Sequence, residues 1–184
     1  ADLAVVSYLA DRVEVYLNDG AGGFSSPSCY DSSVNPSSVA IGDLDGDGDA
    51  DLAVANKFSS SVAILFNDGG GQFTEATYYP TGEDTQPKRV VAQDLDGDGD
   101  LDLATANGSS DNVSILLNNG DGTFSAAANF PSGGETCFSL AAGDLDLDGD
   151  IDLAIANYTT NDLSILLNNG DGSFVFANNM ASCG

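Results

Sequence analysis

Asp43-Leu-Asp-Gly-Asp-Gly-Asp-Ala-Asp51 is the stretch that decides the fold, and the chain contains three versions of it. The other two are Asp94-Leu-Asp-Gly-Asp-Gly-Asp-Leu-Asp102 and Asp144-Leu-Asp-Leu-Asp-Gly-Asp-Ile-Asp152. We call these stretches the acidic loops. Each places five carboxylates within nine residues, and like charges this close repel one another unless a counter-charge neutralises them. A hard divalent cation with oxygen ligands would do so, and Ca²⁺ is the best candidate.

The acidic loops recur at a nearly constant spacing, 51 residues from Asp43 to Asp94 and 50 residues from Asp94 to Asp144. The sequence after each loop repeats too: Leu-Ala-x-Ala-Asn, an apolar run that ends in Asn, a Gly-rich turn and a Phe. The first repeat starts only at the end of its acidic loop, because residues 2–7 align with residues 51–56 of the second repeat. Internal repeats of this length are typical of solenoids, arrays and propellers.

Each repeat contains four short apolar or alternating runs, separated by Gly, Asn, Asp, Ser and Pro. In the second repeat these runs are residues 38–42, 52–55, 62–66 and 73–79. No stretch has helical periodicity over ten or more residues. Four short antiparallel strands in ~50 residues are typical of a propeller blade. We therefore predict an all-β fold, a β-propeller of four-stranded antiparallel blades, with roughly 3.7 blades in this chain.

The repeats predict a single propeller domain over residues 1–184. Its blades are 1–37, which lacks a first strand, 38–88, 89–138 and 139–184. The tail after Phe174 contains no equivalent of the missing strand, so we expect that the chain does not close the ring by itself. Either the sequence is a piece of a longer protein, which we favour, or copies assemble so that one chain completes another. An open strand edge makes association physically reasonable.

Within each acidic loop, the Asp residues at positions 1, 3 and 5 can turn inward, and Gly at position 6 permits a sharp turn. Position 7 would offer its carbonyl, and position 9 would close the shell with a carboxylate. We predict three Ca²⁺ sites, since oxygen-only ligation in a flexible loop favours Ca²⁺ over Mg²⁺. The predicted side-chain ligands are Asp43, Asp45, Asp47, Asp51, Asp94, Asp96, Asp98, Asp102, Asp144, Asp146, Asp148 and Asp152, with the carbonyls of Asp49, Asp100 and Asp150.

The acidic loops have two other interpretations. An EF-hand requires Glu at position 12 and flanking helices, whereas position 12 holds Val54, Thr105 and Ile155 and the flanks have strand patterns. A solvated Asp/Gly turn without an ion is the second alternative. Within the metal interpretation a structural role is favoured over a catalytic one, because no nucleophile or base lies nearby and the chain contains no His.

The acidic pattern Asp-x-Asp-x-Asp-Gly-x-x-Asp, followed by Leu-Ala-x-Ala-Asn and Asn-Gly-Asp-Gly-x-Phe, resembles the FG-GAP/VCBS repeat family. That family includes calcium-binding blades of integrin α-subunit propellers and of some fungal and bacterial lectins. The resemblance covers essentially the whole chain. It implies a β-propeller in which Ca²⁺ rigidifies the loop between the first and second strands of a blade. The departure is the number of blades, which is smaller here than a closed ring needs.

Composition limits the partners that we expect. The net charge is -25, but 42% of the residues are hydrophobic, which indicates a globular chain rather than a disordered one. The four basic residues are Arg12, Lys57, Lys88 and Arg89. With so few cations, neither nucleic acid nor an anionic membrane surface is an expected partner. No apolar run approaches the length of a membrane span, so no membrane insertion is expected.

The three cysteines are too few for a disulfide scaffold and too dispersed for a zinc site, and they allow one disulfide plus one spare thiol. They are Cys29, Cys137 and Cys183. Three sequons, which begin at Asn107, Asn112 and Asn157, are candidate glycan sites if the protein is secreted, with chance occurrence as the alternative. Tyr78, Tyr79 and Tyr158 are candidates for a sugar-binding groove, although packing of the outer strands is the favoured interpretation.

The leading functional hypothesis is an extracellular or cell-surface propeller, stabilised by calcium, that serves adhesion, recognition or structural assembly. Its partner would be a protein or a glycan. The alternative is a carbohydrate-binding lectin with sites between the blades, and a weaker alternative is an accessory propeller of a larger secreted enzyme. Catalysis by this segment is not expected, because it has no His and no pair of acids distinct from the acidic loops.

Overall fold

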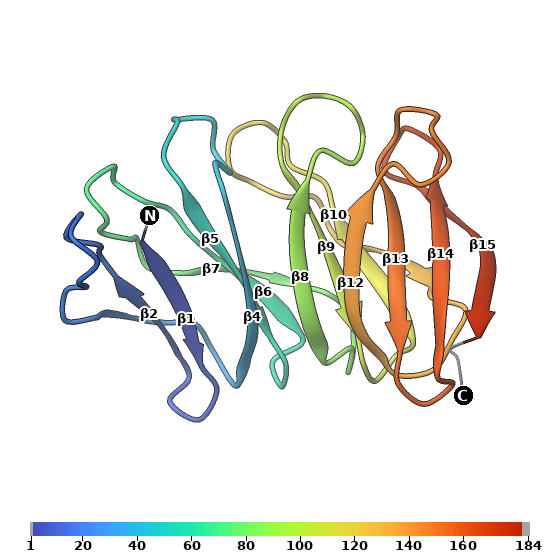
Figure 1. Cartoon of the computed structure of the whole chain (residues 1–184), viewed down its shortest axis with the longest axis horizontal. Coiled ribbons are helices and arrows are strands. Elements are labelled where there is room, and N and C mark those ends of the chain that lie inside the picture. The colour runs from blue at the N-terminus through green and yellow to red at the C-terminus, as the bar shows by residue number, and fades with distance from the viewer. Residues whose placement is uncertain (1, 182–184) are drawn as a thin grey trace.

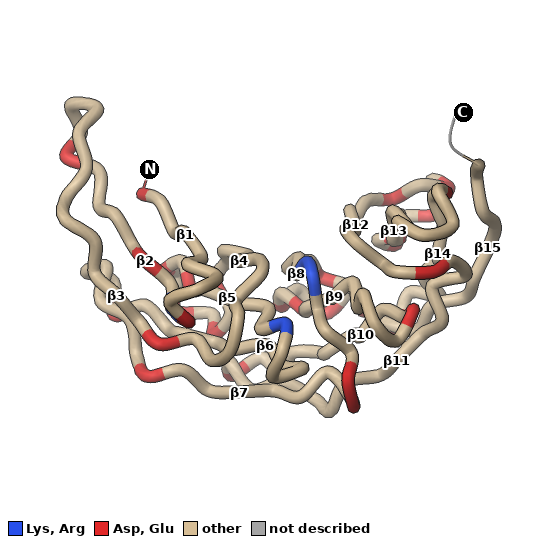
Figure 2. The backbone as a smooth tube through the Cα atoms, turned by 90° about the horizontal axis from the view of Figure 1, so that it is seen from below, with Lys and Arg blue, Asp and Glu red and all other residues tan. Residues whose placement is uncertain are grey.

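The structure, a computed structural model, describes residues 2–181, and these form fifteen β-strands in four antiparallel sheets (Figure 1). We call the sheets blades 1 to 4 in chain order. The all-β prediction is confirmed, and the sheets stand side by side around an open arc rather than a closed ring (Figure 2). Among the described residues, no helix is long and apolar enough to cross a membrane.

Blade 1 has three strands and the other blades have four, each blade in simple sequential order. Blade 1 contains β1 (Leu3–Ser7), β2 (Arg12–Tyr16) and β3 (Ser28–Asp31). Blade 2 contains β4 (Pro36–Gly42), β5 (Asp51–Asn56), β6 (Ser61–Leu65) and β7 (Thr77–Pro80). Blade 3 contains β8 (Pro87–Gln93), β9 (Asp102–Asn107), β10 (Asn112–Leu116) and β11 (Ala128–Pro131). Blade 4 contains β12 (Cys137–Gly143), β13 (Asp152–Asn157), β14 (Asp162–Asn168) and β15 (Phe174–Ala181).

The second strand of each middle blade is buried along its whole length, because both faces of the blade are covered. In β5, Leu52 and Val54 pack in a cluster with Val13 of blade 1, whereas Ala53 and Ala55 pack with residues of blade 3 such as Leu103. Burial on both faces explains why these strands have nearly continuous apolar sequences instead of alternating ones. The strands β4, β8 and β12 line the concave side of the arc, and β7 and β11 lie on its convex side (Figure 2).

An aromatic pair joins each blade to the next near the convex side. In blades 2, 3 and 4, the Phe that follows the Gly-rich turn packs edge-to-face against an aromatic residue of the preceding blade, which lies in that blade's fourth strand or, in blade 1, in β3. The pairs are Tyr30–Phe73, Tyr79–Phe124 and Phe130–Phe174, with ring centroids 5.4, 5.4 and 5.7 Å apart. Edge-to-face geometry is a favoured arrangement for such pairs, and it stabilises them beyond what the burial of their apolar area contributes. The repeated Phe therefore marks a contact between blades.

The fourth strand of blade 2 is shorter than the predicted run, residues 73–79. Only an isolated bridge joins Asn67 to Phe73, and β7 begins at Thr77. Between them the Thr74 hydroxyl accepts a hydrogen bond from the Phe66 backbone N–H at 3.0 Å, so a side chain supplies the acceptor there. Blade 4 has Val175, which lacks a hydroxyl, at the equivalent position, and β15 is paired with β14 from Phe174 onward.

Candidate metal centre

The three acidic loops connect the first and second strands of blades 2, 3 and 4, and all lie at the upper end of the blades in Figure 1. The last Asp of each loop is the first residue of the second strand and is fully buried. In blade 2, Asp51 accepts backbone hydrogen bonds from Leu44 and Asn67, both at 2.8 Å. Asp102 and Asp152 accept the equivalent pairs of bonds at 2.7 to 2.9 Å. One carboxylate therefore fixes the loop to its own blade.

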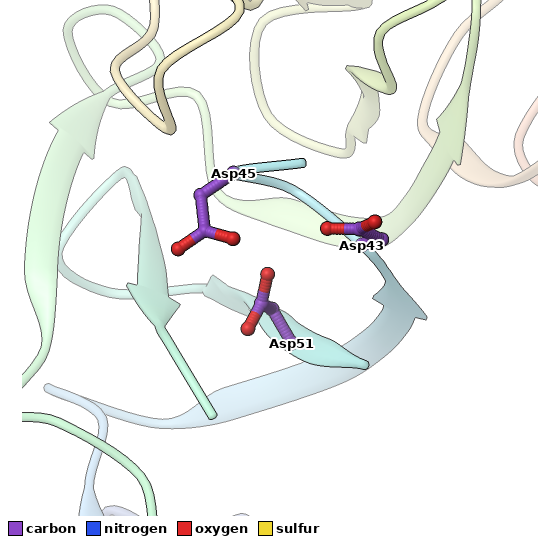
Figure 3. Close-up of side chains that lie close together, drawn as sticks. All are labelled: Asp43, Asp45 and Asp51. Atoms are coloured by element: carbon purple, nitrogen blue, oxygen red, sulfur yellow. The ribbon is translucent and has the colours of Figure 1, made fainter. Parts of the chain in front are cut away.

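Carboxylates at positions 1, 3 and 9 converge in every acidic loop. One oxygen of each lies within 4.8 Å of the others, and the triads are Asp43, Asp45 and Asp51; Asp94, Asp96 and Asp102; and Asp144, Asp146 and Asp152. Figure 3 shows Asp45 and Asp51 with their carboxylates turned toward each other and Asp43 beside them. Oxygens that each lie ~2.4 Å from one ion can be at most about 4.8 Å apart. The triads therefore fit the size of Ca²⁺, and their oxygen-only chemistry suits a hard cation.

The other two predicted positions lie outside these triads. At position 5, Asp47 accepts a hydrogen bond from the Asp49 backbone N–H at 2.9 Å, and Asp98 and Asp148 do the same in their loops. At position 7, the Asp49 side chain packs against Gly69 of its own blade, where an added Cβ would lie 2.5 Å from Asp49 Oδ2. Asp100 and Asp150 pack in the same way against Gly120 and Gly170. Only their backbone carbonyls were predicted as ligands.

The backbone of the acidic loop curls around its first carboxylate. Asp43 accepts hydrogen bonds from the N–H groups of Gly46 and Gly48, at 2.9 and 3.0 Å, and both glycines have positive φ. In the third loop, Leu147 occupies the position of Gly46 and still has a φ of 69°. Positive φ is unfavourable for a bulky side chain. The same curled conformation therefore forms in all three loops, even where the sequence opposes it.

Burial and mutual repulsion oppose ionisation of these carboxyls. Burial, with a smaller contribution from the charges of Asp96 and Asp98, raises the pKa of Asp102 from 3.8 to about 6, although the backbone hydrogen bonds to this carboxylate lower it. Burial also raises the pKa values of Asp51, Asp96 and Asp146. A cation among the oxygens would favour the ionised forms instead.

Two acidic loops are also bonded to the blade that follows them. The Asn118 side-chain amide of blade 3 donates to the Leu44 carbonyl of blade 2 at 2.8 Å and to the Leu101 carbonyl at 3.2 Å. Asn168 donates in the same way to the Leu95 carbonyl at 2.7 Å. Sequence reasoning missed these asparagines as inter-blade contacts and treated the segment as a hairpin turn. The signal was their recurrence at the same place in each repeat.

The sequence model of the FG-GAP-like repeat family matches residues 1–54, 43–105 and 94–155, which together span most of the chain. The chain belongs to the FG-GAP-like repeat family. This agrees with the resemblance deduced from the acidic loops and with the repeated blades. No curated protein matches the chain.

This FG-GAP-like chain spans about half the length of three solved structures that have the same fold. A protein from Lactobacillus plantarum has a TM-score of 0.75 at 21% identity, over 98% of this chain and 52% of its own. A protein from Desulfotomaculum acetoxidans has a TM-score of 0.72 at 13% identity, over 100% and 53%. A lectin from Agrocybe aegerita, described as recognising non-reducing terminal N-acetylglucosamine, has a TM-score of 0.59 at 24% identity, over 93% and 46%. These likenesses show the fold alone.

Two of the three candidate glycan sites, Asn107 and Asn157, use their side-chain amides in hydrogen bonds within their own blades. Asn107 is buried, and its amide donates to the Asn112 side chain at 2.7 Å and the Ser114 hydroxyl at 2.6 Å. Asn157 makes equivalent bonds to Asp162 and Ser164. A glycan attached to either amide nitrogen would displace these hydrogen bonds, so the geometry disfavours Asn107 and Asn157 as glycosylation sites. The hydrogen bonds fit the alternative role of these asparagines, which is to cap the end of a strand.

The tyrosines and cysteines do not form one site. Tyr79 packs against Phe124, whereas Tyr78 and Tyr158 are exposed on different blades. Cys29 is exposed and Cys137 is buried, and both are free thiols. Cys183 lies outside the described residues.

Proposed function

We propose that this chain is a calcium-stabilised propeller module that recognises a protein or glycan ligand outside the cell or at its surface, without catalytic activity. The observation that carries the proposal is the repetition of one carboxylate triad, with the same buried Asp, in all three acidic loops. Three acids at one place can be an accident of an acidic chain. Three triads with the same backbone hydrogen bonds are hard to explain by accident, and they support a repeated metal-binding site.

In each site the ion would supply positive charge among oxygens that otherwise repel one another. Asp43, Asp45 and Asp51 would hold it in the first loop, with the Asp47 side chain and the Asp49 carbonyl as further oxygen ligands. The hydrogen bonds of Asp51 tie the loop to its own blade, and the bond from Asn118 to the Leu44 carbonyl ties it to the next. Loading the site would therefore stabilise the junction between blades as well as the loop.

The high concentration of free calcium outside cells supports the proposed extracellular location. Extracellular calcium modules commonly have dissociation constants of about 10⁻⁴ to 10⁻³ M. A site that binds the folded state alone adds stability by mass action when the free ion exceeds its dissociation constant. Even sites of modest affinity would be filled outside the cell, whereas such sites would stay mostly empty at cytosolic levels.

Thermal unfolding tests this proposal. We expect the melting temperature of the calcium-loaded chain to fall when EDTA is added, to recover with excess Ca²⁺ and to recover much less with Mg²⁺ at the same concentration. A melting temperature that is unchanged by EDTA would contradict a structural role for calcium. The matched control is a variant with Asp43, Asp94 and Asp144 all changed to Asn, whose melting temperature should not respond to Ca²⁺.

A lectin is the second candidate, and the likeness to the Agrocybe aegerita lectin is the observation that favours it. A glycan array probed with the calcium-loaded chain tests this candidate. Binding to a defined set of sugars would support it, and no binding to any sugar would exclude it in favour of protein recognition or assembly.

We also propose that further blades of this repeat, in a longer polypeptide or in a second copy, complete the ring. The four sheets form an open arc, and the solved relatives are about twice as long as this chain. The native mass of the protein from its source tests the idea. A native particle of one 184-residue chain would contradict it.

A further inference from the structure

Three of the four basic side chains of this acidic molecule line one pocket. Lys57, Lys88 and Arg89 come from blades 2 and 3, and the pocket has a volume of about 370 Å³. Its other lining residues are Tyr8, Ser37, Ser38, Phe138 and Ser139, so all four blades contribute. In Figure 2 the blue segment of β8 and the blue segment near β6 lie close together in the middle of the arc. A volume of this size is in the range of small-molecule sites.

The pocket is remote from the acidic loops. Ser38 and Arg89 lie near the starts of β4 and β8, whereas Asp43 and Asp94 follow the ends of these strands. The two members of each pair are five positions apart along a strand, which corresponds to about 16 Å. That distance exceeds the Debye length of about 8 Å at physiological ionic strength, so the loops neutralise the pocket little.

The cations in the pocket have no counter-charge of their own. Within residues 2–181, the ion pair that forms joins Arg12 to Glu14 at 2.9 Å, and it leaves the three pocket cations without a carboxylate partner. The Lys57 ammonium lies over the ring of Phe58, 4.7 Å from its centroid, which is a contact with an uncharged group. Burial first, and then the neighbouring charge of Lys57, lowers the pKa of Lys88. With 29 acidic residues in the chain, three cations that gather without one of them need an explanation.

The pocket is held in shape by contacts between blades. The Ser37 hydroxyl donates to the Pro87 carbonyl at 2.8 Å, which ties the start of β4 to the start of β8. The stem of Lys88 lies against Gly108, where an added Cβ would be 2.5 Å from Lys88 Cε. Two exposed aromatic side chains, Tyr8 and Phe138, stand at the rim. A cluster of cations beside exposed rings suits an oxyanion attached to an organic ring.

We propose that this concave pocket binds a small organic ligand through its carboxylate, sulfate or phosphate group, with Lys57, Lys88 and Arg89 as the oxyanion contacts. Arginine and lysine form their strongest hydrogen bonds with ionised oxygens, and the rings of Tyr8 and Phe138 would cover the body of the ligand. The inference supplies a ligand chemistry for the recognition role proposed above and rests on that role, but not on calcium.

Isothermal titration of the calcium-loaded 184-residue chain at low ionic strength tests the pocket. The probes are glucuronate, sulfate and phosphate, with glucose as the neutral match for glucuronate. We expect saturable binding of at least one oxyanion at one site per chain, and none of glucose. Glucuronate alone would identify a carboxylate ligand, and sulfate or phosphate alone would identify the corresponding ester. No saturable binding of any oxyanion, or equal binding of glucose, would overturn the proposal.

Charge-matched variants locate the binding. Lys88→Gln, and Lys57→Gln separately, should weaken binding about tenfold or more. Arg12→Gln, which makes the same change in net charge on blade 1, should leave it unchanged. An equal loss in Arg12→Gln would mean that diffuse charge, not the pocket, attracts the anion. Calcium titration of the same variants separates the oxyanion pocket from the proposed calcium sites. A variant that loses oxyanion binding but still binds calcium as the unmodified chain does has lost the function of the pocket alone.

Discussion

The side-chain amide of Asn118 offers the sharpest test of how a blade depends on its neighbour. It donates to the Leu44 carbonyl in the acidic loop of blade 2, which lies 74 residues upstream, and to the Leu101 carbonyl in its own blade. Asn118→Ala deletes both bonds, and it also deletes the bond that the Asn118 side-chain oxygen accepts from the Gly120 backbone N–H at 3.0 Å. It keeps the backbone N–H that donates to Asp102. The variant therefore removes the inter-blade contact without disturbing the buried Asp of the second acidic loop.

The magnitude follows from the two carbonyls. Each buried group that is left without its partner costs about 1–3 kcal/mol. Because water can reach part of the loop, we expect a total loss of about 2–3 kcal/mol in the free energy of unfolding. For a chain of this size, 1 kcal/mol corresponds to roughly 2–4 °C. The melting temperature should therefore fall by about 4–12 °C.

Asn67→Ala is the matched control. Asn67 holds the same position in blade 2, but its amide donates to the Ala50 carbonyl of its own blade at 3.1 Å and to no carbonyl of blade 1 among the described residues. Its side-chain oxygen accepts bonds from the Gly69 and Gly71 backbone N–H groups at 3.2 and 3.0 Å, so both variants lose bonds within the turn and only Asn118→Ala loses a bond between blades. Calorimetry of both variants, with calcium and without it, gives the comparison. We expect the smaller loss for Asn67→Ala, about 1 kcal/mol. Equal losses in the two variants would refute the reasoning that the loop is fastened to the next blade.

Three further predictions concern the acidic loops and the contacts between blades. Asp102→Asn should reduce the bound calcium, counted by native mass spectrometry, by one ion per chain, and an unchanged count would place the ion elsewhere. The raised pKa of Asp102, about 6 against 3.8, means that its contribution to the stability of the metal-free fold is present below about pH 4 and is lost as the pH rises through about 6. The melting-temperature gain from calcium should therefore grow between pH 5 and pH 7, and a constant gain would contradict this. Phe124→Ala should destabilise the chain by about 3–5 kcal/mol in urea titrations, whereas Phe24→Ala, an exposed equivalent in blade 1, should cost under ~1 kcal/mol; similar values would rule out the aromatic junction.

The repeat period allowed the four-stranded blades to be predicted, and the acidic pattern predicted a side-chain ligand set of positions 1, 3, 5 and 9, of which the triads contain positions 1, 3 and 9. Both features are local in sequence. Four short runs per repeat give four strands, and positions 1, 3 and 9 of one loop meet without help from elsewhere in the chain. The interrupted fourth strand was not predicted. It depends on whether one residue has a hydroxyl, as Thr74 does and Val175 does not.

The sequence did not say which residues of neighbouring repeats touch one another. The bond from Asn118 to the Leu44 carbonyl depends on which blade covers which loop. The cationic pocket joins Lys57 and Arg89, which lie 32 positions apart in sequence and in different blades. Periodicity gives the alignment of repeats but not their relative placement, so such neighbours emerge from the three-dimensional arrangement alone.

Calcium titration of the metal-free chain by isothermal calorimetry tests the central claim most directly. The three triads predict three ions per chain, with dissociation constants at or below about 10⁻³ M, and much weaker binding of Mg²⁺, which prefers shorter bonds and its own waters. Absence of saturable binding, or equal binding of Mg²⁺ and Ca²⁺, would contradict the assignment of the acidic loops as calcium sites.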